Sequence, residues 1–151
     1  MEAVMQISGR FTVALHVLAY IATFSEQKKV TSAFLAESVN TNAVIIRNIL
    51  LQLKAAGLIR VDRGTGGAYL QQPADEISLL DVYRAVEPLE NGKLFRIHEN
   101  ANKDCPVGRN IREILEGRLS AVQDVMELKL RSMSLADILS DLEDLIEEQK
   151  D

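Results

Sequence analysis

The sequence predicts a mainly helical fold whose front part ends in a small two-stranded hairpin. Apolar residues recur at helical spacing along most of the chain, and Gly and Pro are sparse, with 8 and 3 copies in 151 residues. The period changes only around residues 58–71, where turn-forming residues separate two short apolar runs. At 47% hydrophobic and 26% charged, the composition excludes a wholly disordered chain, and the length fits one domain or a small domain with an added element.

Three helices are expected in the front part. The first covers residues 9–24, with Ser8 as a plausible N-cap. The second covers residues 33–39 and is short. A polar turn over residues 40–42 separates it from the third helix, at about 43–56, because Asn and Thr favour turns and caps over helix interiors.

The third helix is apolar at many positions, so its inner face is broad. The side chains expected to face inward are those of Val44, Ile45, Ile46, Ile49, Leu50, Leu53 and Ala56. Arg47, Asn48 and Leu51 are left nearer the outside. Gly57 ends the helix, as a glycine does where the chain must enter positive φ.

A β-hairpin follows the third helix directly. Residues 58–61 and 68–71 are its strands, and residues 62–67 form a glycine-rich tip. Ser78 is then the expected cap of a fourth helix, at about 79–86.

The back of the chain begins with an irregular polar segment and ends in two helices. The segment covers residues 87–107, and the helices are expected at about 108–131 and 135–148. In the longer helix, Leu115, Leu119, Val122 and Met126 have heptad spacing, over too short a stretch for a firm coiled-coil prediction.

The order of elements in the front part is that of a winged helix-turn-helix. A short helix, a tight turn and a helix with polar outer residues form the helix-turn-helix, and the hairpin is the wing. Charge is unevenly spread: residues 1–72 carry a net +3, whereas the remaining residues carry −8. This asymmetry favours an anionic partner for the front part, although two differently solvated surfaces would also explain it.

Double-stranded DNA is the partner that this arrangement suggests. The candidate contact residues are Ser8, Arg10, Thr41, Asn42, Arg47, Arg63, Thr65 and Gly66. Arg47 is the best candidate for a guanine or phosphate contact. Asn42 has a strong alternative role as a helix cap, Ser8 can be a plain cap, and the glycines of the wing can serve only to make a tight turn.

Several segments of the chain resemble the Rrf2 family of winged-helix regulators. They are Ile7–Phe11, Val44–Leu50, Leu53–Ile59, the wing residues Arg63–Leu70, Glu76–Val82 and Ala85–Glu87. Cys105-Pro106-Val107-Gly108 is similar to a segment of the YwnA-like branch of that family. The wing and the helix after it carry the resemblance; the helix-turn-helix alone is a weak signal.

The resemblance implies a bacterial transcription factor, usually a repressor, that dimerises through the long helix. It also implies a division into a DNA-binding domain at 1–86, a loop or effector region at 87–107 and dimerisation helices at 108–151. Several members hold an iron–sulfur cluster on three cysteines, but this chain contains only Cys105, so we expect no cluster and no other cofactor. Relatives without a cluster include some that respond to thiol oxidation or to a partner protein.

Cys105 is the candidate redox thiol, and the alternative is a partly buried small hydrophobe. A helix N-terminus lowers the pKa of a thiol, whereas the neighbouring Asp104 raises it. His16 and His98 have no ligand partner at metal-binding spacing. No catalytic motif is recognisable, so an enzyme is not expected.

Residues 11–24 are the longest apolar run, too short to span a bilayer, and we expect a cytoplasmic protein. The sequence therefore favours a homodimeric, DNA-binding repressor that reads a palindromic site through residues 43–56 and 59–71. The alternative is a winged-helix protein-interaction module without specific DNA binding. The sequence does not identify the effector or the operator, and it does not decide between repression and activation of transcription.

Overall fold

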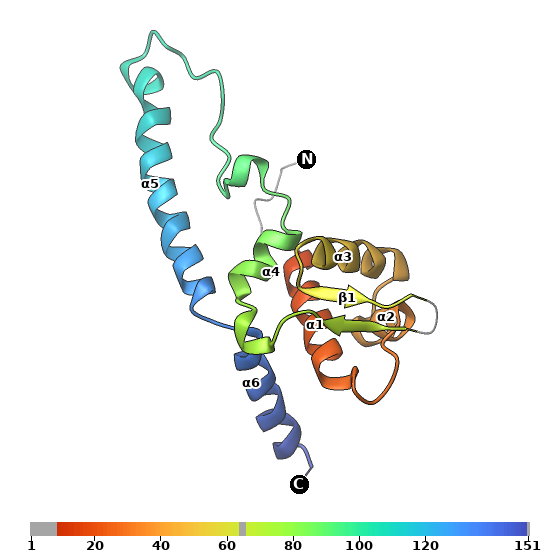
Figure 1. Cartoon of the computed structure of the whole chain (residues 1–151). Coiled ribbons are helices and arrows are strands. Elements are labelled where there is room, and N and C mark those ends of the chain that lie inside the picture. Colours follow the sequence, from red (N-terminus) through yellow and green to blue (C-terminus); the bar gives the residue numbers. More distant parts are fainter. Residues whose placement is uncertain (1–8, 64–65, 151) are drawn as a thin grey trace. The chain divides into compact units, whose positions relative to one another are not determined.

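The computed structural model describes residues 9–63 and 66–150 (Figure 1). Their contacts divide into two compact units. The winged-helix unit contains the described residues 9–63, 66–87 and 130–150, and the second unit contains residues 88–129. Each unit is described separately below.

Helices and a short hairpin alternate in the winged-helix unit. Its helices are α1 (Gly9–Phe24), α2 (Ser32–Val39), α3 (Ala43–Ala55), α4 (Leu79–Val86) and α6 (Leu135–Glu148), with the 3₁₀ turn η1 (Ala74–Glu76) before α4. The hairpin consists of β1 (Ile59–Val61) and β2 (Ala68–Leu70). The mainly helical winged fold expected from the sequence is confirmed.

Side-chain caps set the starts of the helices. The side-chain oxygens of Thr31, Asn42, Ser78 and Ser134 accept hydrogen bonds from the backbone of α2, α3, α4 and α6, respectively. These bonds satisfy N–H groups that have no partner within the helix. At the other end of α3, Gly57 has φ +77°, which confirms the expected glycine stop.

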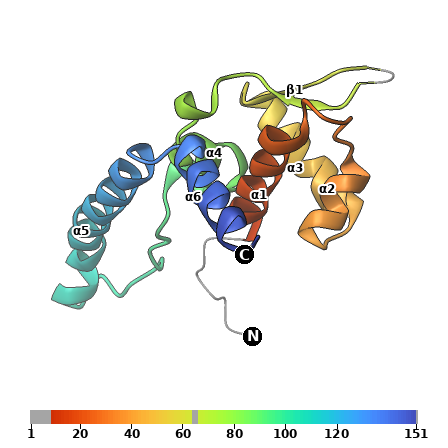
Figure 2. The ribbon, with the colours of Figure 1, turned by 90° about the horizontal axis from the view of Figure 1, so that it is seen from below.

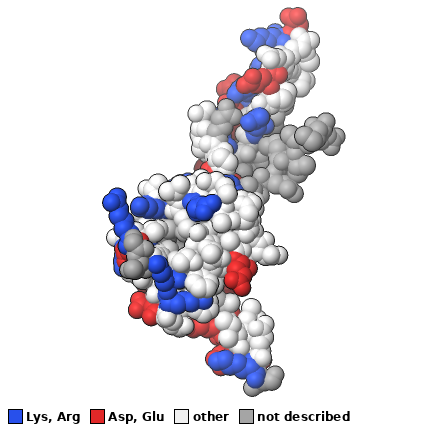
Figure 3. Space-filling model, turned by 90° about the vertical axis from the view of Figure 1, so that its right-hand side faces the viewer, with Lys and Arg blue, Asp and Glu red and all other residues white. Residues whose placement is uncertain are grey.

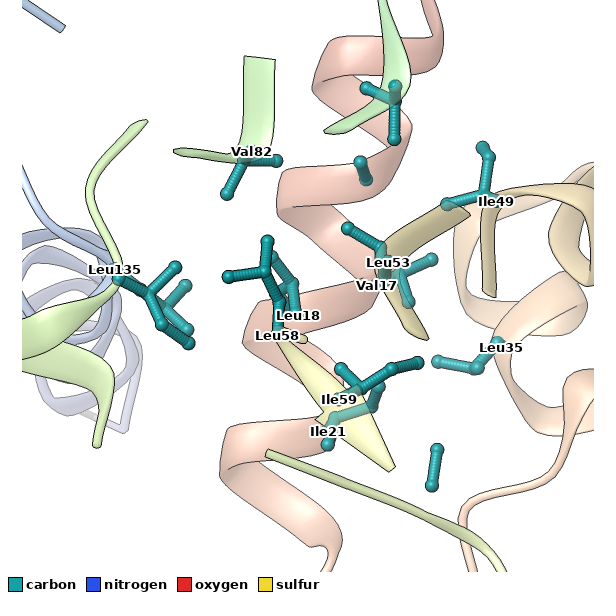
Figure 4. Packing of buried hydrophobic residues seen from close by; sticks show 14 of the residues in the cluster. Val17, Leu18, Ile21, Leu35, Ile49, Leu53, Leu58, Ile59, Val82 and Leu135 are labelled. Atoms are coloured by element: carbon teal, nitrogen blue, oxygen red, sulfur yellow. The ribbon is translucent and has the colours of Figure 1, made fainter. Parts of the chain in front are cut away.

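Helix α1 lies at the centre of the hydrophobic core (Figure 4). Val17, Leu18 and Ile21 of α1 are completely buried. Residues of every neighbouring element pack around them, including Leu35, Ile49, Leu53, Leu58, Ile59, Val82 and Leu135. A core shared by so many elements holds α3 and the hairpin in a set position.

Helix α6 belongs to this core although it is the last element of the chain. Leu135 is fully buried, and α6 lies alongside α1 (Figure 2). The segments before α4 and α6 also pair: Leu79 N–H donates to Met133 O at 2.9 Å, and Leu135 N–H donates to Ile77 O at 2.8 Å. The predicted grouping of α6 with the long helix as dimerisation helices stays a prediction.

The second unit consists of the turn η2 (Glu90–Gly92), an irregular segment and most of α5 (Pro106–Arg131). The segment runs alongside α5 and then turns into its first residue (Figure 1). Helix α5 begins two residues earlier than expected, because Pro is well suited to the first helical position, where no N–H partner is needed. No residue of α5 is buried.

No described helix is long and apolar enough to cross a membrane.

Candidate nucleic-acid interface

Helix α3 presents a mixed polar and apolar outer face. Ile46, Ile49 and Leu53 are completely buried, which turns Arg47 and Asn48 outward. Leu51 is 64% exposed and continues this face toward the helix end. We call the outward residues of α3 (Val44, Ile45, Arg47, Asn48 and Leu51) the outer face of α3.

Two residues of this face were predicted to point inward. Val44 is 58% exposed and Ile45 is 37% exposed, so this part of the sequence interpretation is wrong. Ala56 is also exposed. The correction matters because apolar side chains on such a helix can contact the methyl group of thymine.

The turn before α3 has a structural role that is clear from its hydrogen bonds. Asn42 Oδ1 accepts from Ile45 N–H at 3.0 Å, so the capping role is confirmed, while the rest of the residue stays exposed. Asn40 has φ +63° and Thr41 N–H donates to Ala36 O at 3.0 Å, which closes the end of α2. The turn therefore holds the first residues of α3 at the surface, where the N-terminus of the helix favours a nearby phosphate.

Arg10 is placed against α3 rather than alone on the surface. Its guanidinium donates a hydrogen bond to Gln52 Oε1, which ties the start of α1 to α3. The side chain is half-buried. A DNA contact by Arg10 would have to be shared with this structural bond.

The two strands of the wing contain one charged residue, Arg60. β1 pairs antiparallel with β2, with Arg60 opposite Tyr69. The guanidinium of Arg60 lies 4.6 Å from the centre of the Tyr69 ring and 3.4 Å from the Asp62 carboxylate. Arg60 was not among the predicted contacts, although its position between Ile59 and Val61 at strand spacing would have placed it outward.

The tip of the wing is shaped by close backbone approach. A Cβ on Gly67 would lie 2.6 Å from the backbone nitrogen of Val30, and one on Gly66 would clash with Asp62. These glycines therefore have the structural role given as their alternative. Arg63 is exposed at the start of the tip. The predicted contacts Ser8 and Thr65 lie outside the described residues.

Positive side chains gather on the winged-helix unit (Figure 3). The exposed ones include Lys28, Lys29, Arg47, Lys54, Arg60 and Arg63. Lys28 is engaged locally, because its ammonium lies 4.4 Å from the ring centre of Phe34 and 4.9 Å from that of Phe24. His16 is also structural, as expected: its Nε2 lies 2.9 Å from Ser38 Oγ.

Cys105 lies immediately before α5 and is exposed. The alternative interpretation of Cys105 as a partly buried small hydrophobe is therefore wrong. The backbone N–H groups of Gly108 and Val107 lower the pKa of its thiol, because they stabilise the negatively charged thiolate. No group of three or more His, Cys, Asp or Glu residues that could hold a metal is found in ranges 9–63 and 66–150.

Comparison with known proteins identifies the family. Residues 7–141 match the model of Rrf2, described as an iron-dependent transcriptional regulator. The chain is 42% identical over 136 residues to YwnA of Bacillus subtilis (strain 168), named as a candidate HTH-type transcriptional regulator; the match covers 90% of this chain and 98% of YwnA.

Two solved structures of DNA-binding or regulatory proteins are also similar to this chain. A crystal structure described as that of a candidate DNA-binding protein is 38% identical, with a TM-score of 0.70, covering 86% of this chain and 98% of the other. The crystal structure of a candidate transcriptional regulator from Lactobacillus plantarum is 28% identical to this chain, with a TM-score of 0.76. The match covers 94% of this chain and 97% of the other.

The family description names iron, but an iron–sulfur cluster held by three cysteines does not fit the donors of this chain. A cluster held by three cysteines needs three thiolates from one site, and the chain supplies one. The winged fold, the exposed outer face of α3 and the match over residues 7–141 together show that the chain belongs to the Rrf2 family of transcriptional regulators.

Proposed function

We propose that the chain is a homodimeric repressor that reads a palindromic operator. The recognition helix, residues 43–56, enters the major groove, and the wing, residues 59–71, contacts the neighbouring backbone or minor groove. The alternative, a winged-helix interaction module, would use the same surface to bind protein.

The outer face of α3 is the observation that carries the proposal. An arginine and an asparagine are the side chains that read guanine and adenine edges with paired hydrogen bonds, and here they lie next to each other as Arg47 and Asn48. Val44 stands one turn before them and is suited to a thymine methyl. The side chains of Arg47 and Asn48 have no hydrogen-bond partner among the described residues, so both are available to a ligand.

Dimerisation is supported by an apolar stripe on α5. Its large exposed side chains are Val107, Ile114, Val122, Val125 and Leu128, between 53% and 68% exposed. Val107, Ile114 and Leu128 share one heptad position, seven and fourteen residues apart, and Val125 lies three residues before Leu128. Of the four heptad residues singled out in the sequence, Leu115, Leu119 and Met126 are half-buried within the chain, and only Val122 belongs to the exposed set. The seam we propose is therefore this α5 stripe.

We further propose that the protein regulates without a resident iron–sulfur cluster and without catalysis. The single thiol per chain supports regulation without a cluster. The relatives named as transcriptional regulators support a function without catalysis. Contact with the chromosome would place the protein in the cytoplasm.

The test is a DNA-selection experiment on the purified protein, read by sequencing at two salt concentrations. We expect a palindromic site with two half-sites, because two-fold symmetric dimers bind symmetric sites. Arg47→Ala is expected to weaken binding by about 1–3 kcal/mol and to relax one base position in each half-site. Arg109→Ala, an equal loss of charge on the exposed surface of α5, serves as the matched control and is expected to leave the selected site unchanged.

Two outcomes would contradict the proposal. Selection of no sequence at low salt would favour the interaction module, since phosphate contacts are strongest there. An enriched site without internal symmetry, bound by a monomer, would contradict the homodimer.

A further inference from the structure

A cavity of about 400 Å³ lies within the second unit, between residues 93–97 and α5. Its volume is in the range of small-molecule binding pockets. The residues that line it are Lys93, Phe95, Ile97, Glu113, Glu116, Gly117, Leu119, Ser120 and Gln123. The DNA-binding proposal uses none of them.

The cavity has charges of both signs at its rim. Lys93 and Glu113 are exposed, and neither has an ion-pair partner among the described residues. Glu116 differs, because Arg112 Nε lies 3.1 Å from its carboxylate. An ammonium and a carboxylate without ion-pair partners thus line the same cavity, which suits a ligand that carries both charges.

Apolar side chains form another part of the wall. Phe95 and Ile97 come from the irregular segment and Leu119 comes from α5, and all three are half-buried. These side chains would bury an apolar group of a ligand, which is the largest favourable contribution that such a site can offer.

The cavity is held open by two features of α5. Gly117 has no side chain, and a Cβ built there meets no atom within 4 Å. Gln123 fixes the start of the segment to the helix: its Oε1 accepts from Leu94 N–H at 2.9 Å, and its Nε2 donates to Gly92 O at 2.7 Å.

The cavity also stays open in the dimer proposed above. Residues 113, 116, 117, 119, 120 and 123 of α5 line it, whereas the α5 stripe is centred on positions such as 107, 114 and 125. At about 100° per residue the centres of these two sides are roughly 150° apart around the helix. A partner seated on the α5 stripe therefore leaves the opening accessible.

We propose that this cavity binds a free α-amino acid with an apolar side chain. Glu113 pairs with the ammonium of the ligand, Lys93 pairs with its carboxylate, and the apolar side chain packs on Phe95, Ile97 and Leu119. The ligand bridges the irregular segment and α5, and it thereby stabilises their packing. This binding site is additional to the DNA-binding surface and does not depend on it.

The test is isothermal titration calorimetry on the full-length protein without DNA. The probes are L-leucine, L-methionine and L-phenylalanine, together with two leucine fragments: 3-methylbutylamine, which lacks the carboxylate, and 4-methylpentanoate, which lacks the ammonium. We expect saturable binding of at least one amino acid. For leucine, we expect binding that is weaker by about tenfold or more for each fragment, because each fragment loses a charge-assisted contact.

Three variants locate the site. Glu113→Gln and Lys93→Gln are each expected to weaken binding by about tenfold or more. Gly117→Leu fills the cavity without displacing backbone and should abolish binding while leaving the helix at least as stable, because glycine is a poor helix former. Glu143→Gln and Lys103→Gln, which remove equivalent exposed charges elsewhere, are the matched controls and should bind as the parent does.

Absence of binding for all three amino acids would overturn the proposal, and so would unchanged binding by Gly117→Leu. Fragments that bind as tightly as leucine would overturn the pairing of both charges. Because the measurement contains no DNA, its failure leaves the repressor proposal standing. Failure of the DNA selection likewise does not contradict the proposed amino-acid site.

Discussion

Asn42 caps the start of α3 and is also one of the predicted DNA contacts. Its side chain caps the helix by accepting from Ile45 N–H, and its exposed position lies beside the first residues of the recognition helix. Asn42→Ala is expected to lower the free energy of unfolding by about 1 kcal/mol, as measured by urea denaturation, because the cap is lost.

Asn42→Asp separates the cap from the contact with DNA. Aspartate caps as well as asparagine, so stability should be retained, but its negative charge faces the DNA phosphates and should weaken operator binding. An Asp variant that binds the operator like the parent would show that this position stays away from the DNA backbone.

Cys105 illustrates how one backbone arrangement changes the chemistry of a side chain. The N–H groups at the start of α5 favour the thiolate, so the pKa of the thiol is lowered. We predict that the rate of its alkylation by iodoacetamide increases with pH, as the thiol ionises. In the folded protein this increase should occur at lower pH than in the chain unfolded in urea. Identical pH profiles for folded and unfolded protein would contradict this.

At the scale of single elements, the sequence predicts where a helix begins and ends better than which side of the helix is buried. Capping residues and Gly57 locate the helices to within two residues, because each satisfies a local backbone requirement. The outward direction of Val44 and Ile45 could not be read in the same way. Apolar residues occupy so many positions of α3 that periodicity selects no single face, and only the packing of Ile46 and Ile49 against the rest of the core decides it.

The cavity beside α5 is a second feature that could not be predicted from the sequence. Gly117 sits in a regular helix and has no local signal of function. The space it leaves is visible only once residues 93–97 are placed beside it, because this contact joins positions some twenty residues apart through an irregular segment.

Helix α5 is the element on which the dimer prediction rests. Ile114→Asp and Val125→Asp each place a charge in the α5 stripe, where pairing with another copy would bury it without a partner. We expect each variant to be monomeric at concentrations at which the parent is dimeric, as measured by analytical ultracentrifugation. Leu51→Asp, at a similarly exposed leucine on α3, should remain dimeric; loss of the dimer in all three variants would contradict a role for this stripe.

At the scale of the whole molecule, the C-terminal helix and the proposed DNA-binding surface are linked by one core. Leu135 is fully buried among residues from the first half of the chain, and the backbone bonds between the segments before α4 and α6 hold it there. Sequence order alone associates α6 with the preceding long helix, since the two are consecutive. The contact with α1 spans more than a hundred residues and leaves no local pattern.

This linkage makes a prediction about stability far from the DNA surface. Leu135→Ala leaves a cavity in the core, so it should lower the free energy of unfolding by about 2–5 kcal/mol in urea denaturation. Leu145→Ala, on the same helix but 54% exposed, should stay within about 0.5 kcal/mol of the parent. Because α1 and α3 share that core, Leu135→Ala should also reduce the fraction of protein competent to bind the operator at elevated temperature. Equal and small effects of the two substitutions would mean that α6 is a separate element, and the winged-helix residues would then have to fold without it.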